Sequence, residues 1–364
     1  MKVGIVGLPG AGKTTVFQVL TGVVSVGTGK QDASMGMTRV PDQRIDVLTG
    51  MFKPKKTMYA QVEVVDIAGR TTVQAQSGPD DPRARSRNLT LLINNMRNVD
   101  ALINVVRAFP SLEHGEAKPL SAASSLDDEL ILADMAIVEG RVERLESQRR
   151  RSAEEEQELG LMKRLAAGFG EGLGIRQLGL NDDEIAALRG YGLLSLKPVV
   201  VAVNVDEGQY SSAEFPHKPE LEAWCVQRNL PLIVLCAEIE AEIAELPEEE
   251  RAVFMEEYSI TRTGVEQVSQ AVYGSLGMIS FLTVGEDEVR AWPIKQGTSA
   301  RQAAGTIHTD IERGFIRAEI VAYDHLMKVG SYAAARAAGL FRLEGRDYIM
   351  QDGDIVNFRF SPAR

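Results

Sequence analysis

The chain has 364 residues, of which 44% are hydrophobic and 25% charged, with 40 Lys and Arg against 51 Asp and Glu. This composition, with only 2 cysteines, excludes a disordered, a collagen-like or a disulfide-stapled chain. No apolar run approaches the roughly 20 residues that span a bilayer, so we expect a cytoplasmic protein with no membrane partner. The net charge of -11 argues against broad polyanion binding and against DNA-specific binding, but it allows a local basic patch.

Short apolar runs alternate with helical segments in much of the chain. Residues 2–6 are a β-branched run, followed by a glycine-rich loop and a helical stretch at 14–20. Further strand candidates lie at 61–66, 101–106, 198–203 and 231–235. This alternation predicts an α/β domain with a doubly wound, mostly parallel sheet.

A segment of different character interrupts the predicted sheet. Within residues 126–158, apolar side chains recur at helical intervals and charges crowd the other positions; the apolar ones include Leu130, Ala133, Ile137 and Leu145. A second helical stretch follows at 157–167. The pattern predicts an inserted helical hairpin resembling a coiled coil, with its charged runs on a solvated surface.

The last part of the chain changes character again. From residue 277 onward, strand candidates at 279–284, 319–323 and 355–360 accompany a tight turn at 351–354. We therefore expect a separate C-terminal α+β module.

The strongest motif is GLPGAGKT at residues 7–14, which fits the P-loop pattern between a strand and a helix. Its backbone N–H groups and the helix N-terminus would hold phosphates. We expect Lys13 to reach the β- and γ-phosphates and the Thr14 hydroxyl to bind Mg²⁺. The predicted phosphate-binding residues are Gly10, Ala11, Gly12, Lys13, Thr14 and Thr15.

A second motif, DIAG at residues 66–69, follows a predicted strand. A carboxylate there can hold Mg²⁺ through water, and the glycine N–H can meet the γ-phosphate. Asp66 is therefore the second predicted metal residue.

A third motif, NVDE at residues 204–207, lies where GTPases place N-K-x-D. In those proteins the Asp accepts two hydrogen bonds from guanine, whereas here Glu207 is longer by a methylene and Val205 replaces the lysine. Guanine specificity is weakened and adenine becomes plausible. Asn204, Val205 and Glu207 are the predicted base-site residues.

The CAE sequence at residues 236–238 follows another predicted strand, where GTPases place a loop whose backbone touches the base. Cys236 and Ala237 are therefore further predicted nucleotide-binding residues. Cys236 reads equally well as an ordinary buried thiol or as a redox residue.

Together the motifs resemble the YchF / Obg-like ATPase family. The most specific matches are in the C-terminal module: EVRAW at 288–292, AAGTIHTD at 303–310, GFIRAE at 314–319 and EGRDYIMQDGD at 344–354. VPD at 40–42, KPKK at 53–56 and VVRAF at 105–109 also match. The resemblance implies a G domain (1–125 and 197–277), an inserted helical hairpin (126–196) and a TGS-type β-grasp domain (278–364).

The resemblance also implies an activity. Family members bind and hydrolyse ATP in preference to GTP, act with Mg²⁺, associate with ribosomes or ribosomal RNA, and are linked to oxidative stress. It places Val205 at adenine and implicates a mobile-loop histidine in hydrolysis, at a position that His114 matches. We therefore expect an ATPase that binds ATP or ADP and acts as a ribosome-associated switch.

Several positions depart from the family pattern. Gly10 and Ala11 stand where the family has Asn and Val, Lys30 stands at the Mg²⁺-binding Thr of the first switch with Thr28 nearby, and Arg70 replaces an apolar residue. These departures keep two alternatives open: a binding module with little hydrolysis that contacts RNA or protein through its TGS-type domain, and a plain GTPase in which Glu207 reads guanine.

Overall fold

The computed structural model describes residues 1–22, 35–67, 82–258 and 260–361. Contacts divide the chain into two compact units. Unit 1 comprises Met1–Thr38 and Glu63–Val272, and unit 2 comprises Arg39–Val62 and Tyr273–Arg364. In the described residues, no helix is long and apolar enough to cross a membrane.

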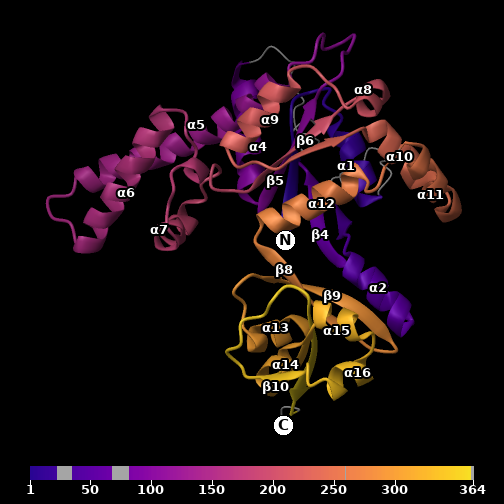
Figure 1. Cartoon of the computed structure of the whole chain (residues 1–364). Coiled ribbons are helices and arrows are strands. Elements are labelled where there is room, and N and C mark those ends of the chain that lie inside the picture. Colours follow the sequence, from indigo (N-terminus) through magenta and orange to yellow (C-terminus); the bar gives the residue numbers. More distant parts are fainter. Residues whose placement is uncertain (23–34, 68–81, 259, 362–364) are drawn as a thin grey trace. The chain divides into compact units, whose positions relative to one another are not determined.

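The sheet of unit 1 confirms the predicted, mostly parallel architecture (Figure 1). Its strand order is β2-β4-β1-β5-β6-β7, and β1 pairs in parallel with β4 and β5, β5 with β6, and β6 with β7. Every residue of β6 is buried, which explains its continuous apolar sequence. The strands are β1 (Lys2–Val6), β2 (Met35–Val40), β4 (Ala60–Asp66), β5 (Ala101–Arg107), β6 (Val199–Asn204) and β7 (Leu232–Leu235).

The first helix beside this sheet buries one apolar side. In α1 (Lys13–Thr21), Val16, Phe17 and Leu20 point into the core, at the spacing expected of an amphipathic helix. The other helices around the sheet are α4 (Pro82–Arg97), α8 (Glu207–Ser212), α9 (Lys218–Gln227), α10 (Ala237–Glu245), α11 (Glu248–Glu257) and α12 (Gly264–Ser275).

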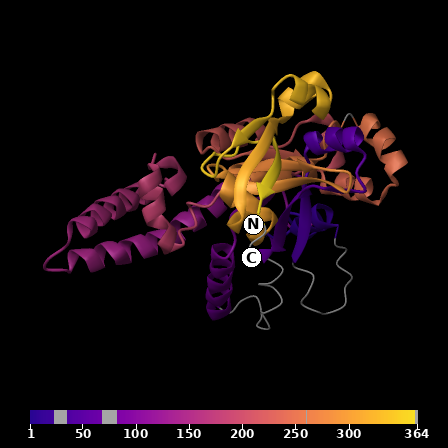
Figure 2. The same cartoon turned by 90° about the horizontal axis from the view of Figure 1, so that it is seen from below.

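The inserted hairpin is present, but its first helix was predicted with the wrong bounds. Figure 1 and Figure 2 both show α5 (Pro119–Glu146) and α6 (Ala153–Gly170) side by side, extending away from the sheet of unit 1. The first helix therefore starts earlier and ends before residue 158. The reason is local, because the Ser152 side chain and Glu155 form a capping box that starts a new helix. Short elements then lead back to the sheet: η1 (Ile175–Gln177), α7 (Asp182–Leu188) and η2 (Arg189–Tyr191).

Two buried carboxylates of α5 bind the segment that leads from the hairpin back to the sheet. Asp134, which is fully buried in α5, accepts hydrogen bonds from the backbone N–H groups of Leu194 and Ser195, both at 2.7 Å. Asp127, about two turns earlier on α5, forms ion pairs with Arg176 at 2.6 Å and Arg228 at 3.2 Å. These pairs satisfy charges that burial would otherwise make costly.

Unit 2 is the expected α+β module, with sheet order β11-β10-β12-β8-β9-β3. Its core contains Phe281, Ile320, Met350 and Phe358, packed under α13. The strands are β3 (Lys56–Met58), β8 (Met278–Val284), β9 (Glu288–Lys295), β10 (Phe315–Ala322), β11 (Arg342–Glu344) and β12 (Asp354–Phe360). The helices are α2 (Gln43–Phe52), α13 (Ala300–Ile307), α14 (Thr309–Arg313), α15 (Tyr323–Val329) and α16 (Tyr332–Ala337).

The observed division differs from the expected domain bounds in two places. Residues 39–62, which were expected in the G domain, belong to unit 2, because β3 adds in parallel to β9 and Arg44 pairs with Asp352 at 2.8 Å. The hairpin, which was expected as a domain of its own, clusters with the sheet of unit 1. Both differences arise from contacts between segments that are remote in sequence.

Candidate functional site

The glycine-rich loop connects β1 directly to α1. Gly10 and Gly12 have φ angles of +73° and +85°, a region that L side chains rarely adopt, so glycine is required for this turn. Gly12 precedes the first residue of α1, and its carbonyl accepts the N–H of Val16 at 2.9 Å. The first N–H groups of a helix have no partner within the helix, and together with the helix dipole they make this turn a ready site for phosphate.

Lys13 folds back over the same loop. Its Nζ donates to the carbonyl of Leu8 at 2.8 Å. Burial lowers the pKa of Lys13, and the negative charge of Asp66 opposes that shift. The ammonium group is therefore held by a carbonyl of the loop, and an incoming phosphate would provide a stronger counter-charge than that carbonyl does.

The predicted metal residues supply oxygen donors suited to Mg²⁺. Asp66 is 6% exposed at the end of β4, in register with Ile5 of β1, and Thr14 is exposed in the first turn of α1. The described residues contain no cluster of three or more His, Cys, Asp or Glu that could hold a metal. A small number of protein ligands is typical of Mg²⁺ sites, because the ion keeps several waters and takes its remaining oxygen ligands from phosphates. Ala68 and Gly69 of the DIAG motif, and Thr28, Lys30 and Arg70, lie outside the described residues.

His114 lies directly against the glycine-rich loop. A Cβ added to Gly10 would stand 2.1 Å from Cδ2 and 2.5 Å from Nε2 of the imidazole. The side chain of His114 is 30% exposed, so water can reach it. The fold thus brings together a loop histidine and a P-loop residue that are about a hundred positions apart.

Arg107 holds the loop that carries His114, a role that the sequence analysis missed. Its guanidinium donates to the carbonyls of Phe109 at 2.6 Å, His114 at 3.1 Å and Gly115 at 3.0 Å. Ser111 and Gly115 close the same loop with two backbone hydrogen bonds, of 3.0 and 2.7 Å. The available signal was an arginine placed directly after the apolar run of β5, at the end of a parallel strand where binding residues gather.

Asn204 joins three of the predicted motifs. Its Nδ2 donates to the carbonyl of Ala11 at 3.1 Å, and its Oδ1 accepts the N–H of Ala237 at 3.0 Å. The side chain is 4% exposed, so both bonds are shielded from water. Asn204 therefore ties the phosphate loop to the base-site loops instead of facing solvent.

The remaining base-site residues divide into buried and exposed ones. Val205 is 2% exposed and packs in the core, so its side chain offers almost no apolar surface. Glu207 is exposed in the first turn of α8. Cys236 is 1% exposed, and burial raises the pKa of its thiol. Both properties are typical of a structural cysteine and not of a reactive thiolate.

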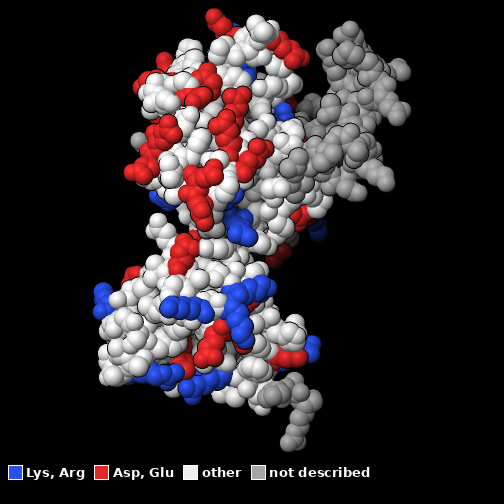
Figure 3. Space-filling view, turned by 90° about the vertical axis from the view of Figure 1, so that its right-hand side faces the viewer, with Lys and Arg blue, Asp and Glu red and all other residues white. Residues whose placement is uncertain are grey.

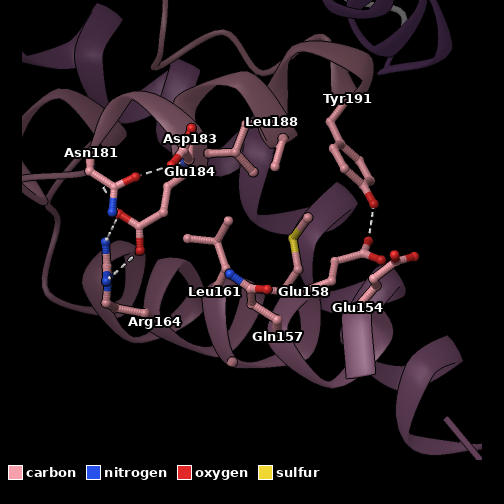
Figure 4. A pocket seen from close by; sticks show the side chains of 13 residues that line it. Glu154, Gln157, Glu158, Leu161, Arg164, Asn181, Asp183, Glu184, Leu188 and Tyr191 are labelled. Carbon is pink, nitrogen blue, oxygen red and sulfur yellow. Dashed lines mark hydrogen bonds and ion pairs between the residues drawn. The ribbon is translucent and has the colours of Figure 1, made fainter. Parts of the chain in front are cut away.

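A separate cavity of about 620 Å³ lies between α6 and α7 (Figure 4). None of the predicted site residues lines it. Two of its carboxylates are already paired, Glu158 with Arg141 at 2.7 Å and Glu184 with Arg164 at 2.9 Å. The cavity is a polar groove of the hairpin, distinct from the phosphate loop.

Comparison with known proteins matches both parts of the chain. Residues 2–154 match the family model described as a 50S ribosome-binding GTPase, and residues 278–361 match the model of a YchF-type GTPase C-terminal domain, described as a protein of unknown function. The "Ribosome-binding ATPase YchF" of Bacillus subtilis is 36% identical over 99% of both chains. The "Obg-like ATPase 1" of Oryza sativa subsp. japonica is 34% identical over 99% of this chain and 92% of that relative.

Solved structures agree. The Schizosaccharomyces pombe YchF GTPase superposes with a TM-score of 0.86 at 31% identity, over 99% of this chain and 97% of that one. A GTP-binding protein from Pyrococcus horikoshii shares the fold, with a TM-score of 0.59 at 20% identity. Since relatives more than 30% identical match 99% of this chain, the chain belongs to the YchF / Obg-like ATPase family.

Proposed function

We propose that this protein is a Mg²⁺-dependent ATPase that prefers ATP to GTP and acts as a cytoplasmic, ribosome-associated switch. The observation that carries the proposal is the imidazole of His114 lying against Gly10 of the phosphate loop. An imidazole beside the phosphate loop supports a role as proton acceptor for the attacking water.

Each group at the site has a role in this activity. Lys13 and the N–H groups of residues 10–15 bind the phosphates, while Thr14 and Asp66 hold Mg²⁺, which neutralises phosphate charge when bound. His114 orients the attacking water or accepts its proton. Arg107 keeps the histidine loop in place through three carbonyls.

The base preference rests on Glu207. Guanine presents two neighbouring donors, N1–H and N2–H₂, which a short, fixed carboxylate accepts together. Glu207 has an additional methylene, so holding both donors costs extra side-chain entropy. Adenine presents one donor and one acceptor, which suit backbone groups. The relatives carry both ATPase and GTPase in their names.

Ribosome association follows from the name of the Bacillus subtilis relative and from how charge is distributed. Unit 2 holds 16 Lys and Arg against 13 Asp and Glu, a formal charge of +3, whereas unit 1 carries −14. Figure 3 shows Asp and Glu predominating on the visible face of unit 1, while Lys and Arg are prominent on unit 2. Ribosomal RNA would therefore be met by unit 2, since phosphate contacts depend on Lys and Arg.

Titration of ATP and GTP with Mg²⁺, together with phosphate release, tests the proposal. We expect ATP to bind about ten- to a hundredfold more tightly than GTP and to be hydrolysed. Tight ATP binding without phosphate release would indicate a binding module instead. GTP binding as tightly as ATP would indicate a GTPase. Co-sedimentation of the full chain with ribosomes, with and without ATP, tests the partner.

A further inference from the structure

Tyr258, at the C-terminal end of α11, forms a hydrogen bond with Glu207. Glu207 is the exposed acidic residue of the N-x-x-E motif, which was predicted to contact the base. The hydroxyl of Tyr258 donates to Oε1 of Glu207 at 2.7 Å. The two residues are 51 positions apart, so the fold and not local sequence brings them together. No resemblance or motif assigned a role to Tyr258.

The tyrosine is fixed in place by its own neighbours. Its ring stacks on Phe254, with ring centroids 4.8 Å apart and an interplanar angle of 28°. Its backbone N–H caps the end of α11 by donating to the carbonyl of Phe254 at 3.2 Å. The hydrogen bond to Glu207 raises the pKa of Tyr258, so the phenol stays protonated and remains a donor. The donor that faces Glu207 is therefore both charge-neutral and anchored.

The backbone of Glu207 is equally well placed. Asp206 caps α8 through a capping box with Gln209, which sets the direction in which the first turn points. Asn204 links this turn to the Ala237 loop, as described above. With the backbone held, the direction of the carboxylate depends on side-chain rotation and on the group that it binds.

Reading guanine requires both carboxylate oxygens to face the base edge. A carboxylate whose Oε1 is turned toward Tyr258 can offer guanine only one well-directed oxygen. Guanine binding must then break a charge-assisted hydrogen bond, whereas adenine, read by backbone groups, leaves that bond intact. The contact therefore disfavours guanine binding and leaves adenine binding unaffected.

We propose that Tyr258 is a specificity-determining residue, which turns the Glu207 carboxylate away from the guanine edge and so favours adenine nucleotides. The proposal rests on the proposed function, since it concerns the same nucleotide site, and it adds the physical source of the base preference. Tyr258 acts through Glu207, as a positioning residue.

The test is the Tyr258→Phe variant, which keeps the ring stacked on Phe254 and removes only the hydroxyl. We expect Kd for GTP to fall by about fivefold while Kd for ATP changes by less than about twofold. Tyr191→Phe is the matched control, because Tyr191 also donates to a glutamate, Glu158, but lies in the hairpin. That control should leave both affinities unchanged.

A second pair of variants separates this role from a merely structural one. In a Glu207→Gln background, the side chain can no longer accept both guanine donors, so adding Tyr258→Phe should not improve GTP binding. The same gain in both backgrounds, or equal changes for ATP and GTP, would overturn the proposal.

The outcome is distinguishable from failure of the proposed function. If the parent protein binds neither nucleotide, or binds GTP as tightly as ATP, the proposed function fails, whatever the variant does. If the parent prefers ATP and Tyr258→Phe leaves the ATP-to-GTP ratio unchanged, only the role of Tyr258 fails.

Discussion

Gly10→Ala is the most direct test of the contact between the phosphate loop and His114. The added methyl group would lie 2.1 Å from Cδ2 and 2.5 Å from Nε2 of the imidazole, far inside van der Waals contact. Arg107 clamps the backbone of the histidine loop and α1 follows closely on the phosphate loop, so the imidazole side chain is the group that can move. We expect it to rotate away from the phosphates.

The magnitude has two parts. An alanine at the φ of Gly10 costs about 1–2 kcal/mol of backbone strain, and loss of a positioned proton acceptor lowers turnover by roughly 10²- to 10⁴-fold. Because the imidazole is displaced and not deleted, we expect Gly10→Ala to lower ATP turnover by about ten- to a hundredfold. His114→Ala should lower it by at least the same factor and leave ATP affinity nearly intact.

The assay is single-turnover phosphate release, with ATP affinity measured separately by titration. In the His114→Ala background, Gly10→Ala should change turnover by less than about threefold, because the group that it displaces is already gone. Gly22→Ala is the matched control, since Gly22 has a φ of +66° but, among the described residues, no atom within 4 Å of an added Cβ. Alanine at this position has a similar backbone strain but no steric clash with the described residues.

Parental turnover in Gly10→Ala would refute the reasoning, because it would show that the imidazole need not stay where the structure has it. A loss of turnover matched by an equal loss of ATP affinity would also refute it, since that pattern indicates a distorted phosphate loop.

Three further changes test other parts of the structure. Lys13→Ala should weaken ATP binding at least tenfold, because it removes charge-assisted hydrogen bonds to phosphate, and unchanged titrations would mean that ATP binds elsewhere. Asp134→Ala should lower the free energy of unfolding by about 2–5 kcal/mol in urea denaturation, because it leaves two buried N–H groups unpaired; Asp134→Asn, which keeps one acceptor, should cost less. Burial raises the pKa of Glu240 to about 6, from an ordinary value of 4.5, so the stability that its protonated form contributes is present below pH 4.5 and lost as pH rises through 6. Glu240→Gln should therefore gain about 2 kcal/mol of unfolding free energy relative to the parent between pH 4.5 and pH 7.5, and a difference independent of pH would contradict this.

Much of the site was predictable because its chemistry is local in the chain. The P-loop pattern requires glycines at fixed offsets, and the structure finds Gly10 and Gly12 with the positive φ angles that justify them. The strand at residues 2–6 and the buried run of β6 were likewise readable from apolar β-branched residues. The burial of Val205 could not be predicted, because the sequence does not show that its side chain points into the core.

The helix bounds were predicted wrongly where two local signals, helical periodicity and a capping sequence, conflict. The helical periodicity of residues 126–158 continues across the turn of the hairpin, so it concealed the end of α5 at Glu146. A capping signal at Ser152 and Glu155 was present and would have placed the start of α6 near Ala153. The periodicity was right about which residues are buried, since Leu130 and Leu145 are, but it said nothing about where the helix stops.

The sequence by itself determined the family, the parallel sheet, the phosphate loop and the identity of the candidate groups, because each depends on residue types at short, fixed spacing. Only the tertiary structure decided which groups meet. His114 against Gly10, Tyr258 on Glu207 and β3 beside β9 all join segments that are distant along the chain. The physical reason is that such contacts depend on the summed packing of a whole core, which no short stretch of sequence encodes.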